Sequence, residues 1–134
     1  MTGIVELDEL LSSMSPELMA EEYAFCTVDG ELRDYLHLQP LATFIEAEGL
    51  TLVVTIKAAE KQGLAYEGVF KRITLTVHSS LEAVGLTAAI ATRLSASGIS
   101  ANVIAAYYHD HVFVQADKAD EALLALNEFS KASS

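Results

Sequence analysis

Residues 70–130 alternate strand and helix patterns in an order that leaves few folds open to this chain. In residues 73–78 apolar side chains alternate with polar ones, which predicts a half-buried strand with one core face. The apolar residues that follow recur at helical spacing, and this helix is expected to stop at Gly98. Its inward stripe consists of Leu86, Ala89, Ile90 and Leu94.

Two further strands and a last helix complete the pattern. Residues 99–108 and 111–116 have strand character and are expected to join through His109 and Asp110. Residues 120–129 then predict a helix, with inward-facing residues Ala122, Leu123, Leu126 and Phe129. The order strand-helix-strand-strand-helix is typical of α+β proteins in which helices cover an antiparallel sheet.

The chain opens with a helical pattern and then a strand pattern. Leucines at helical spacing in residues 6–14 predict a short amphipathic helix, and Ser15-Pro16 is expected to turn the chain. Residues 21–30 carry aromatic and β-branched side chains up to Asp29-Gly30, which predicts a strand followed by a tight turn. Residues 31–40 favour no single structure.

A hairpin followed by a helix occurs twice in the sequence. Residues 40–55 predict two strands folded around Glu48-Gly49, and residues 57–64 predict a helix that ends at Gly63. Residues 105–129 have the same order, which is a weak internal repeat. We therefore expect an N-terminal half of residues 1–70 and a C-terminal half of residues 71–134. Because no Pro-, Gly- or Ser-rich linker separates them, we expect the halves to share a sheet or to pack tightly.

Charge and cysteine content exclude several classes of partner. The chain has 19 acidic residues against 8 Lys and Arg, a net charge of −11, which repels phosphate backbones and anionic lipid surfaces. Nucleic acid and membrane are therefore not expected as partners, and the sequence has neither a secretory signal pattern nor a membrane-spanning run. The single Cys26 lies in an apolar strand pattern and is expected to be a core residue. A cytoplasmic location follows as an expectation.

Motifs of catalysis are missing from the sequence. It has no GxSxG, no cysteine with a neighbouring base and no GxxxxGK[ST] loop. We therefore expect no enzymatic activity and no cofactor.

The glycine-bounded first helix of the C-terminal half carries a resemblance to a known family. Residues 84–87 (VGLT) enter this helix, residues 98–104 (GISANVI) enter the next strand, and residues 107–114 (YYHDHVFV) form the second hairpin. Together they resemble the ACT domain, and in particular small bacterial proteins with two ACT-like halves and no attached enzyme. The resemblance implies a ferredoxin-like fold in both halves. The C-terminal half ends after its last helix without a fourth strand, and a strand from the N-terminal half is the candidate to fill that place.

ACT domains are regulatory folds that bind amino acids or similar small molecules, often where two domains meet. In this family the turn between the first strand and the first helix, with the start of the second strand, lines the ligand site. The resemblance therefore implies a ligand site in the C-terminal half. Its expected residues are Ser80, Leu81, Val84, Gly85, Leu86, Thr87, Asn102 and Val103.

The chemistry of these residues suits ligand binding, but each of them also has a simpler structural role. Gly85 lets a ligand approach the backbone where a helix start offers unpaired N–H groups, but it also suits a tight turn with nothing bound. Asn102 can hold the amine and the carboxylate of an amino acid, or satisfy loop backbone groups. Glu46 and Glu48 share one face if their strand is regular. Their carboxylates could then bind an ammonium group, and the simpler alternative is that both are solvated.

The histidines offer a third hypothesis, a metal site. His109 and His111 lie two residues apart, and His78 from another strand is a conceivable third ligand. Because no HExxH or CxxC spacing supports a metal, we instead expect Asp110 to form the hairpin turn and the imidazoles to pack beside Tyr107 or Tyr108.

The resemblance to the ACT domain thus implies a non-catalytic module that binds a small molecule, in this family an amino acid, and acts through self-association or a partner. A homodimer is the expected assembly. The alternative is a structural dimerisation protein without a ligand, and the less favoured one is a histidine-based metal-binding protein.

Overall fold

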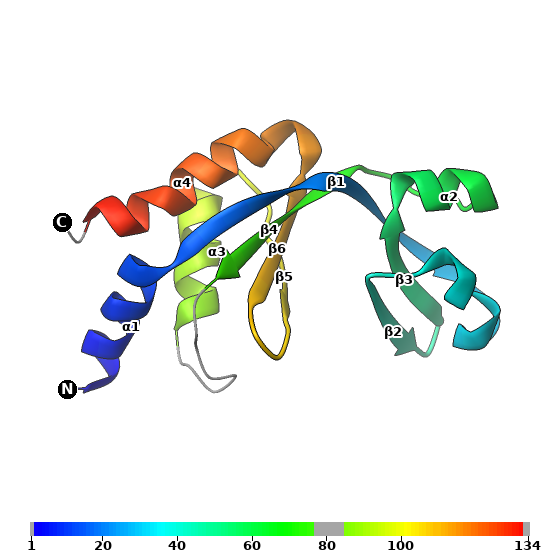
Figure 1. Cartoon of the computed structure of the whole chain (residues 1–134), viewed down its shortest axis with the longest axis horizontal. Coiled ribbons are helices and arrows are strands. Elements are labelled where there is room, and N and C mark those ends of the chain that lie inside the picture. The colour runs from blue at the N-terminus through cyan, green and yellow to red at the C-terminus, as the bar shows by residue number, and fades with distance from the viewer. Residues whose placement is uncertain (1, 77–84, 133–134) are drawn as a thin grey trace. The chain divides into compact units, whose positions relative to one another are not determined.

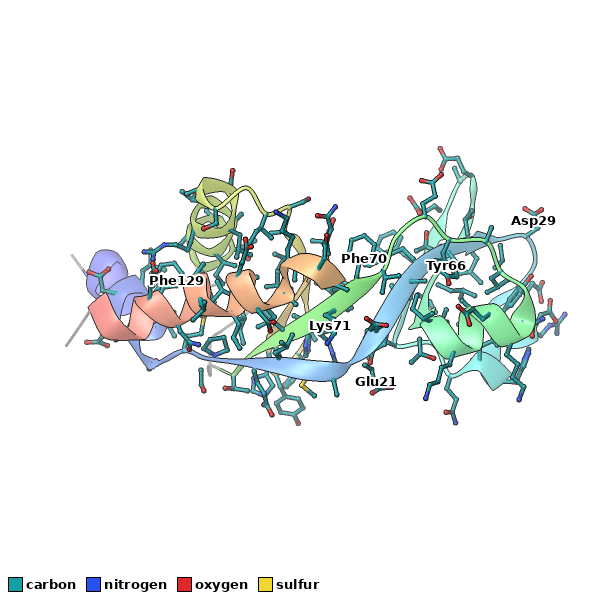
Figure 2. All side chains as sticks on the ribbon, turned by 90° about the horizontal axis from the view of Figure 1, so that it is seen from above. Glu21, Asp29, Tyr66, Phe70, Lys71 and Phe129 are labelled. Carbon is teal, nitrogen blue, oxygen red and sulfur yellow. The ribbon has the colours of Figure 1, made fainter. Side chains whose placement is uncertain are left out.

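The computed structural model describes residues 2–76 and 85–132, and the described chain forms two compact units (Figure 1). Unit 1 consists of Met1–Ala20 with Lys71–Ser134, and unit 2 consists of Glu21–Phe70. Figure 2 labels the residues at the boundaries, Glu21, Phe70 and Lys71. The first twenty residues therefore pack with the C-terminal half. The division of the sequence into halves at residue 70 stays a prediction.

Unit 1 has the strand-helix-strand-strand-helix order that the sequence predicts. The elements are β4 (Phe70–Thr76), α3 (Leu86–Ala96), β5 (Asn102–Ala105), β6 (Asp110–Gln115), a 3₁₀ turn η3 (Ala116–Lys118) and α4 (Ala119–Ala132). Strands β4, β6 and β5 are neighbours in that order, and β5 pairs with β6 in antiparallel register, with Val103 opposite Val112. The predicted α+β fold is confirmed.

The core of unit 1 forms where α3 and α4 cover one face of this sheet. The predicted alternation places Ile73 and Leu75 at 0% exposure, and Thr74 between them lies on the opposite face. Helix α3 buries Leu86, Ile90 and Leu94, and α4 buries Ala122 and Leu126, with Leu123 and Phe129 packed at the margin. The predicted inward stripes are thus confirmed except at Ala89, which is half-buried and lies outside the core cluster.

The place of the missing fourth strand is taken by the start of β1 (Ser15–Val28), which is the neighbour of β4. The hydroxyl of Thr76 donates to the backbone carbonyl of Ser15 at 2.7 Å. Helix α1 (Thr2–Ser13) contacts α3 and α4, and Met14, directly after it, is 2% exposed in the same core. A strand from the N-terminal half therefore completes the sheet of the C-terminal half.

The turn expected at Ser15-Pro16 was wrong, because β1 begins at Ser15 and runs unbroken for 14 residues. Proline has no backbone N–H to donate and a fixed φ, and both are tolerated near the start of a strand. The turn expected at Asp110 was also displaced. Asp110 is the first residue of β6, opposite Ala105, and the backbone N–H of Ala106 bonds to the carbonyl of His109 across the turn.

Unit 2 contains the later part of β1, the hairpin of β2 (Ala42–Glu46) and β3 (Gly49–Thr55), and helix α2 (Ile56–Gln62). Two 3₁₀ turns, η1 (Leu32–Asp34) and η2 (Leu36–Leu38), occupy the segment for which the sequence favours no single structure. The strand order is β2-β3-β1, antiparallel throughout, so β2 is the edge strand of this unit. The predicted hairpin and the helix ending at Gly63 are confirmed.

The core of unit 2 lies between its sheet and α2. Cross-strand pairs such as Ala24 with Val54 and Cys26 with Leu52 put apolar side chains on the face that α2 covers with Ala59. The side chain of Thr55 caps α2 by accepting from the N–H of Ala58 at 3.2 Å. Cys26 is a buried free thiol, and burial raises its pKa, so it is a core residue and not an activated nucleophile.

No helix within the described residues is long and apolar enough to span a membrane.

Candidate functional site

The strand-to-helix turn of the C-terminal half is described only from Gly85 onward. Ser80, Leu81 and Val84 lie outside the described residues. Gly85 precedes α3 with a φ of 91°, a left-handed conformation that glycine adopts without steric cost. Thr87 is exposed, whereas the side chain of Leu86 is 2% exposed and belongs to the core. Of the two expected side chains that the structure describes at this turn, that of Thr87 faces solvent and that of Leu86 does not.

The open side of Gly85 is occupied by the chain itself. A Cβ atom built on Gly85 would lie 3.1 Å from Cδ2 of Leu7, which belongs to α1. Glycine thus allows a close approach at this turn, as expected, but a leucine from the first helix makes that approach. The space beside Gly85 is therefore not free for a ligand while α1 is docked.

Asn102 and Val103 follow the opposite end of α3 from Gly85 (Figure 1). An eleven-residue helix is about 16 Å long, so these two parts of the expected site are not brought together. The Nδ2 of Asn102 donates to the backbone carbonyl of Phe113 at 3.3 Å, across the β5–β6 pair, and Val103 is half-buried against the core. A ligand role for these residues stays a prediction.

The histidines of the β5–β6 hairpin have separate surroundings. Nδ1 of His111 lies 3.0 Å from Oγ1 of Thr74 on the neighbouring strand, while His109 lies 6.5 Å from the ring of Tyr108. His78 falls outside the described residues. Within the part of the chain that is described, no group of three or more His, Cys, Asp or Glu residues is arranged to hold a metal ion.

Burial lowers the pKa of His111 below its ordinary value of 6.5. Neighbouring Arg72 and His109 lower this pKa further because they disfavour a second positive charge, while Asp110 acts in the opposite direction. The folded state therefore takes up this proton less readily than the unfolded state. The contribution of His111 to the free energy of unfolding is therefore fully present above the ordinary pKa of histidine, and it decreases as the pH falls below that value.

His111→Gln is expected to reduce this pH dependence. The free energy of unfolding, measured in urea between about pH 8 and about pH 5, should fall less steeply in the variant, since no imidazole is left to be protonated on unfolding. Subtracting the two curves removes the contribution of carboxylates common to both proteins. Parallel curves would show that the proton affinity of His111 is the same in both states.

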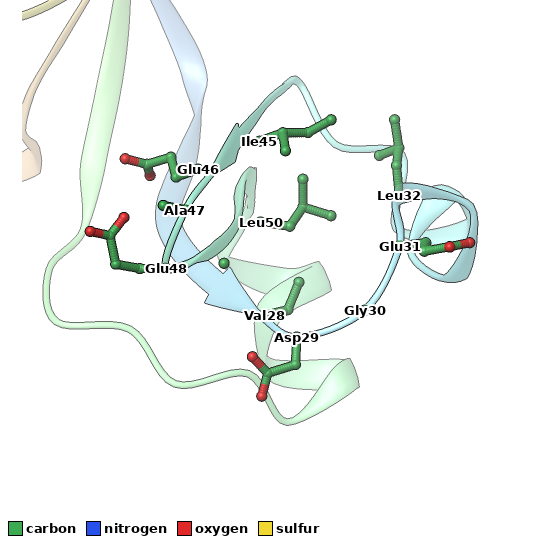
Figure 3. Close-up of a pocket in the computed structure, with 11 residues that line it drawn as sticks. Val28, Asp29, Gly30, Glu31, Leu32, Ile45, Glu46, Ala47, Glu48 and Leu50 are labelled. Atoms are coloured by element: carbon green, nitrogen blue, oxygen red, sulfur yellow. The ribbon is translucent and has the colours of Figure 1, made fainter.

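A hollow on unit 2 has the dimensions of a ligand site (Figure 3). It has a volume of about 410 Å³, which lies within the usual range for small-molecule sites. Eleven residues line it, and they come from two segments, the end of β1 with the turn into η1 and the end of β2 with the turn into β3. These residues are Val28, Asp29, Gly30, Glu31, Leu32, Ile45, Glu46, Ala47, Glu48, Gly49 and Leu50.

The interior of the hollow is apolar. Val28 and Leu50 are directly paired in the sheet, and Leu50 is paired with Ile45 on its other side, so the three side chains share one face. Val28 and Leu50 are buried at 8% and 5% exposure, whereas Ile45 is 81% exposed and Leu32, across the hollow, 36%. An isoleucine this exposed beside a buried apolar floor leaves hydrophobic surface for a ligand to cover.

The rim of the hollow is acidic. Four of the eleven lining residues carry carboxylates and none of the eleven is Lys, Arg or His. Glu31 pairs with Arg33 at 2.7 Å, and Glu46 accepts from the hydroxyl of Thr51 at 2.5 Å. The carboxylates of Glu46 and Glu48 lie on the same side, and they point away from Ile45 and Leu50 (Figure 3). The rim thus adds negative potential, and the carboxylates of Glu46 and Glu48 do not enter the apolar interior (Figure 3).

Sequence reasoning named Glu46 and Glu48 but missed the hollow between their turn and the Asp29-Gly30 turn. The signal that was present is positional. Asp29-Gly30 directly follows β1, and the 3₁₀ turn η1 begins two residues after Gly30. Gly30 has a positive φ of 112°, as Gly85 has one of 91° before α3. In both halves a glycine with positive φ therefore precedes a helical segment, and in unit 2 this glycine borders a hollow.

Comparison with known proteins identifies the family. A model of the ACT domain matches residues 2–71 and a second ACT domain model matches residues 71–128. A protein of unknown function from Vibrio cholerae, described as a possible transport protein, is 63% identical over 96% of this chain and 98% of its own, with a TM-score of 0.89. No curated protein matches the chain.

More distant solved structures share the fold. An Agrobacterium tumefaciens protein is 13% identical over 87% of this chain and 89% of its own, with a TM-score of 0.72. The ligand-free regulatory subunit of aspartate kinase from Thermus thermophilus is 10% identical over 86% of this chain and 95% of its own, with a TM-score of 0.55. With both halves matched by the same domain, the chain belongs to the ACT domain family as a tandem of two ACT domains.

Proposed function

We propose that this chain is a non-catalytic regulatory module that binds an amino acid or a related small molecule. The observation that carries the proposal is the hollow of unit 2, which lies at the strand-to-helical turn of the N-terminal ACT domain. Its size suits a small ligand, its floor is apolar, and its acidic rim favours an ammonium group. A cytoplasmic location is part of the proposal and is supported by the free, buried Cys26.

The module would act by linkage between ligand binding and association. A ligand shifts an association equilibrium by the difference between its affinities for the associated and the free states. The edge strand β2 supports self-association as a homodimer, because Phe44 and Ile45 are 70% and 81% exposed on its two faces. Ile45 and Glu46 also line the hollow, so a bound ligand would lie beside the surface that associates.

The alternative function is that of a dimerisation protein without a ligand. It would also associate through β2, but nothing would bind in the hollow. In the C-terminal domain, Leu7 fills the open side of the turn near Gly85, and a filled turn is consistent with a dimerisation protein that binds no ligand. The hollow of unit 2 favours the ligand-binding function for the N-terminal domain. The residues expected from the family resemblance, Asn102 among them, remain a proposed second site.

Titration calorimetry of the purified protein against the twenty proteinogenic amino acids tests the proposal. At least one amino acid should bind, and sedimentation velocity should show the average mass changing when that ligand is present. Binding unaltered in Asn102→Ala would show that Asn102 does not contact the ligand, as a site in unit 2 requires, whereas loss of binding in this variant would favour a site in the C-terminal domain. Absence of heat with all twenty would contradict a module for amino acids.

A further inference from the structure

We propose that the hollow of unit 2 selects amino acids with an uncharged aliphatic side chain, which would lie against Ile45, Leu32 and Leu50 while the ammonium group lies toward the acidic rim. This inference rests on the proposed function and names the class of ligand. It commits to a small molecule as the occupant, because the hollow of about 410 Å³ has the volume of a small-molecule site.

The shape of the apolar surface supports an aliphatic occupant. Val28, Leu50 and Ile45 come from three adjacent strands and present one continuous apolar face. In Figure 3, Ile45 and Leu50 point toward the side of the hollow on which Leu32 lies. The buried floor of Val28 and Leu50 is continuous with the core of unit 2, and Ile45 and Leu32 extend it into solvent. A branched aliphatic group placed there would be covered on several sides.

The distribution of charge supports the second part of the inference. The lining of the hollow supplies carboxylates from four residues and no basic side chain of its own, and Arg33 outside the lining pairs with one of the four, Glu31. An aspartate or glutamate ligand would bring a further negative charge to this rim and would be repelled. The ammonium group of an aliphatic amino acid is attracted by the same field. Since Glu46 and Glu48 point away from Ile45 and Leu50, these two carboxylates are not placed to receive a polar side chain that lies against the apolar surface (Figure 3).

Three pairs of ligands that differ in one group separate these contributions in calorimetry. Leucine should bind and aspartate should not, because their side chains are similar in size but differ in charge. Valine should bind more tightly than threonine, which has nearly the same shape with one hydroxyl. Leucine should bind more tightly than 4-methylpentanoate, which has the same carbon skeleton and carboxylate but no ammonium group.

Ile45→Ser tests the place of binding, and Leu124→Ser is the matched control. Both leave a serine at an exposed aliphatic position, since Ile45 is 81% exposed and Leu124, on α4 in unit 1, is 66% exposed. We expect Ile45→Ser to weaken leucine binding roughly tenfold or more, the scale of losing an apolar contact in a ligand pocket, and Leu124→Ser to leave it unchanged. Thermal unfolding followed by circular dichroism verifies that both variants are folded.

The outcomes distinguish this inference from the proposed function. If no amino acid binds, the proposed function fails. If aspartate or glutamate binds as tightly as leucine, or Ile45→Ser binds leucine like the wild type, the aliphatic selection is wrong while the module remains an amino-acid binder. If Ile45→Ser abolishes self-association and leaves leucine binding intact, the exposed face belongs to a copy of this chain and the inference is overturned.

Discussion

Residues 71–134 expressed alone are expected not to fold, although an ACT domain model matches residues 71–128 and the segment contains both helices and the hairpin of unit 1 that follow β4. The fragment lacks the start of β1, which is the neighbour of β4, and it lacks Met14, which is 2% exposed in the core of unit 1. Leu7, Leu10 and Leu11 of α1 pack against the same core. Loss of one large buried side chain costs about 2–5 kcal/mol, against a total stability of about 5–15 kcal/mol for a domain.

A circularly permuted chain shows whether the fragment fails to fold because it lacks residues 1–20 or because residues 71–134 are unstable in any context. Residues 71–134 followed by a Gly/Ser linker and residues 1–20 restore the whole of unit 1. We expect this permutant to unfold cooperatively in urea and the fragment 71–134 to give a broad, non-cooperative change in circular dichroism. A sharp transition in the fragment would show that the first twenty residues are dispensable.

Leu126→Ala is expected to lower the free energy of unfolding of unit 1 by about 3 kcal/mol. Leu126 is fully buried at 0% exposure, where α4 packs on the sheet beside Leu75 and Val114 in one core cluster. Truncation removes the apolar contacts of the side chain and leaves a cavity that close-packed neighbours cannot fully collapse into.

Leu124→Ala on the same helix is the control for this prediction. It makes the same chemical change with the same effect on helix propensity, but Leu124 is 66% exposed, so its effect should stay within about 0.5 kcal/mol. Both values come from urea unfolding curves followed by circular dichroism. Equal destabilisation by the two substitutions would mean that α4 does not pack on the sheet in the way described.

Local periodicity was sufficient for most elements of unit 1. The Ile73–Leu75 alternation and the Leu86, Ile90, Leu94 stripe each have a period that only one secondary structure satisfies, and each buries the predicted side chains. The hairpin around Glu48-Gly49 was predicted for the same kind of reason, because the turn and both flanking strands are contiguous in sequence.

Local periodicity could not predict which segments pair when they lie far apart in the sequence. The extended segment from Ser15 to Ala20 carries little periodicity of its own, and it becomes strand because β4 lies beside it, more than fifty residues later in the chain. The contact of Leu7 with the open side of Gly85 has the same origin. A glycine indicates that something approaches closely, but the sequence does not say whether a ligand or another part of the chain does.

The hollow of unit 2 illustrates the same limit for the site. Asp29-Gly30 and Glu48-Gly49 are each recognisable as turns, yet Leu32 and Ile45 come to border one hollow only when β1 and β2 take places on either side of β3. Moreover, the sequence pattern indicates only that Ile45 is a strand residue, and its 81% exposure follows from the edge position of β2.

By itself the sequence determined the α+β class, the order of elements in the C-terminal half, the family and the acidic surface, since these depend on composition and on contacts near in the chain. Tertiary structure alone decided that the first twenty residues complete the C-terminal sheet, that Leu7 covers Gly85, and that the hollow lies in unit 2. The physical reason is that backbone hydrogen bonds between strands are available to any extended segment. Which segments pair, and which apolar surfaces stay open, is therefore settled only when all of them compete for one sheet.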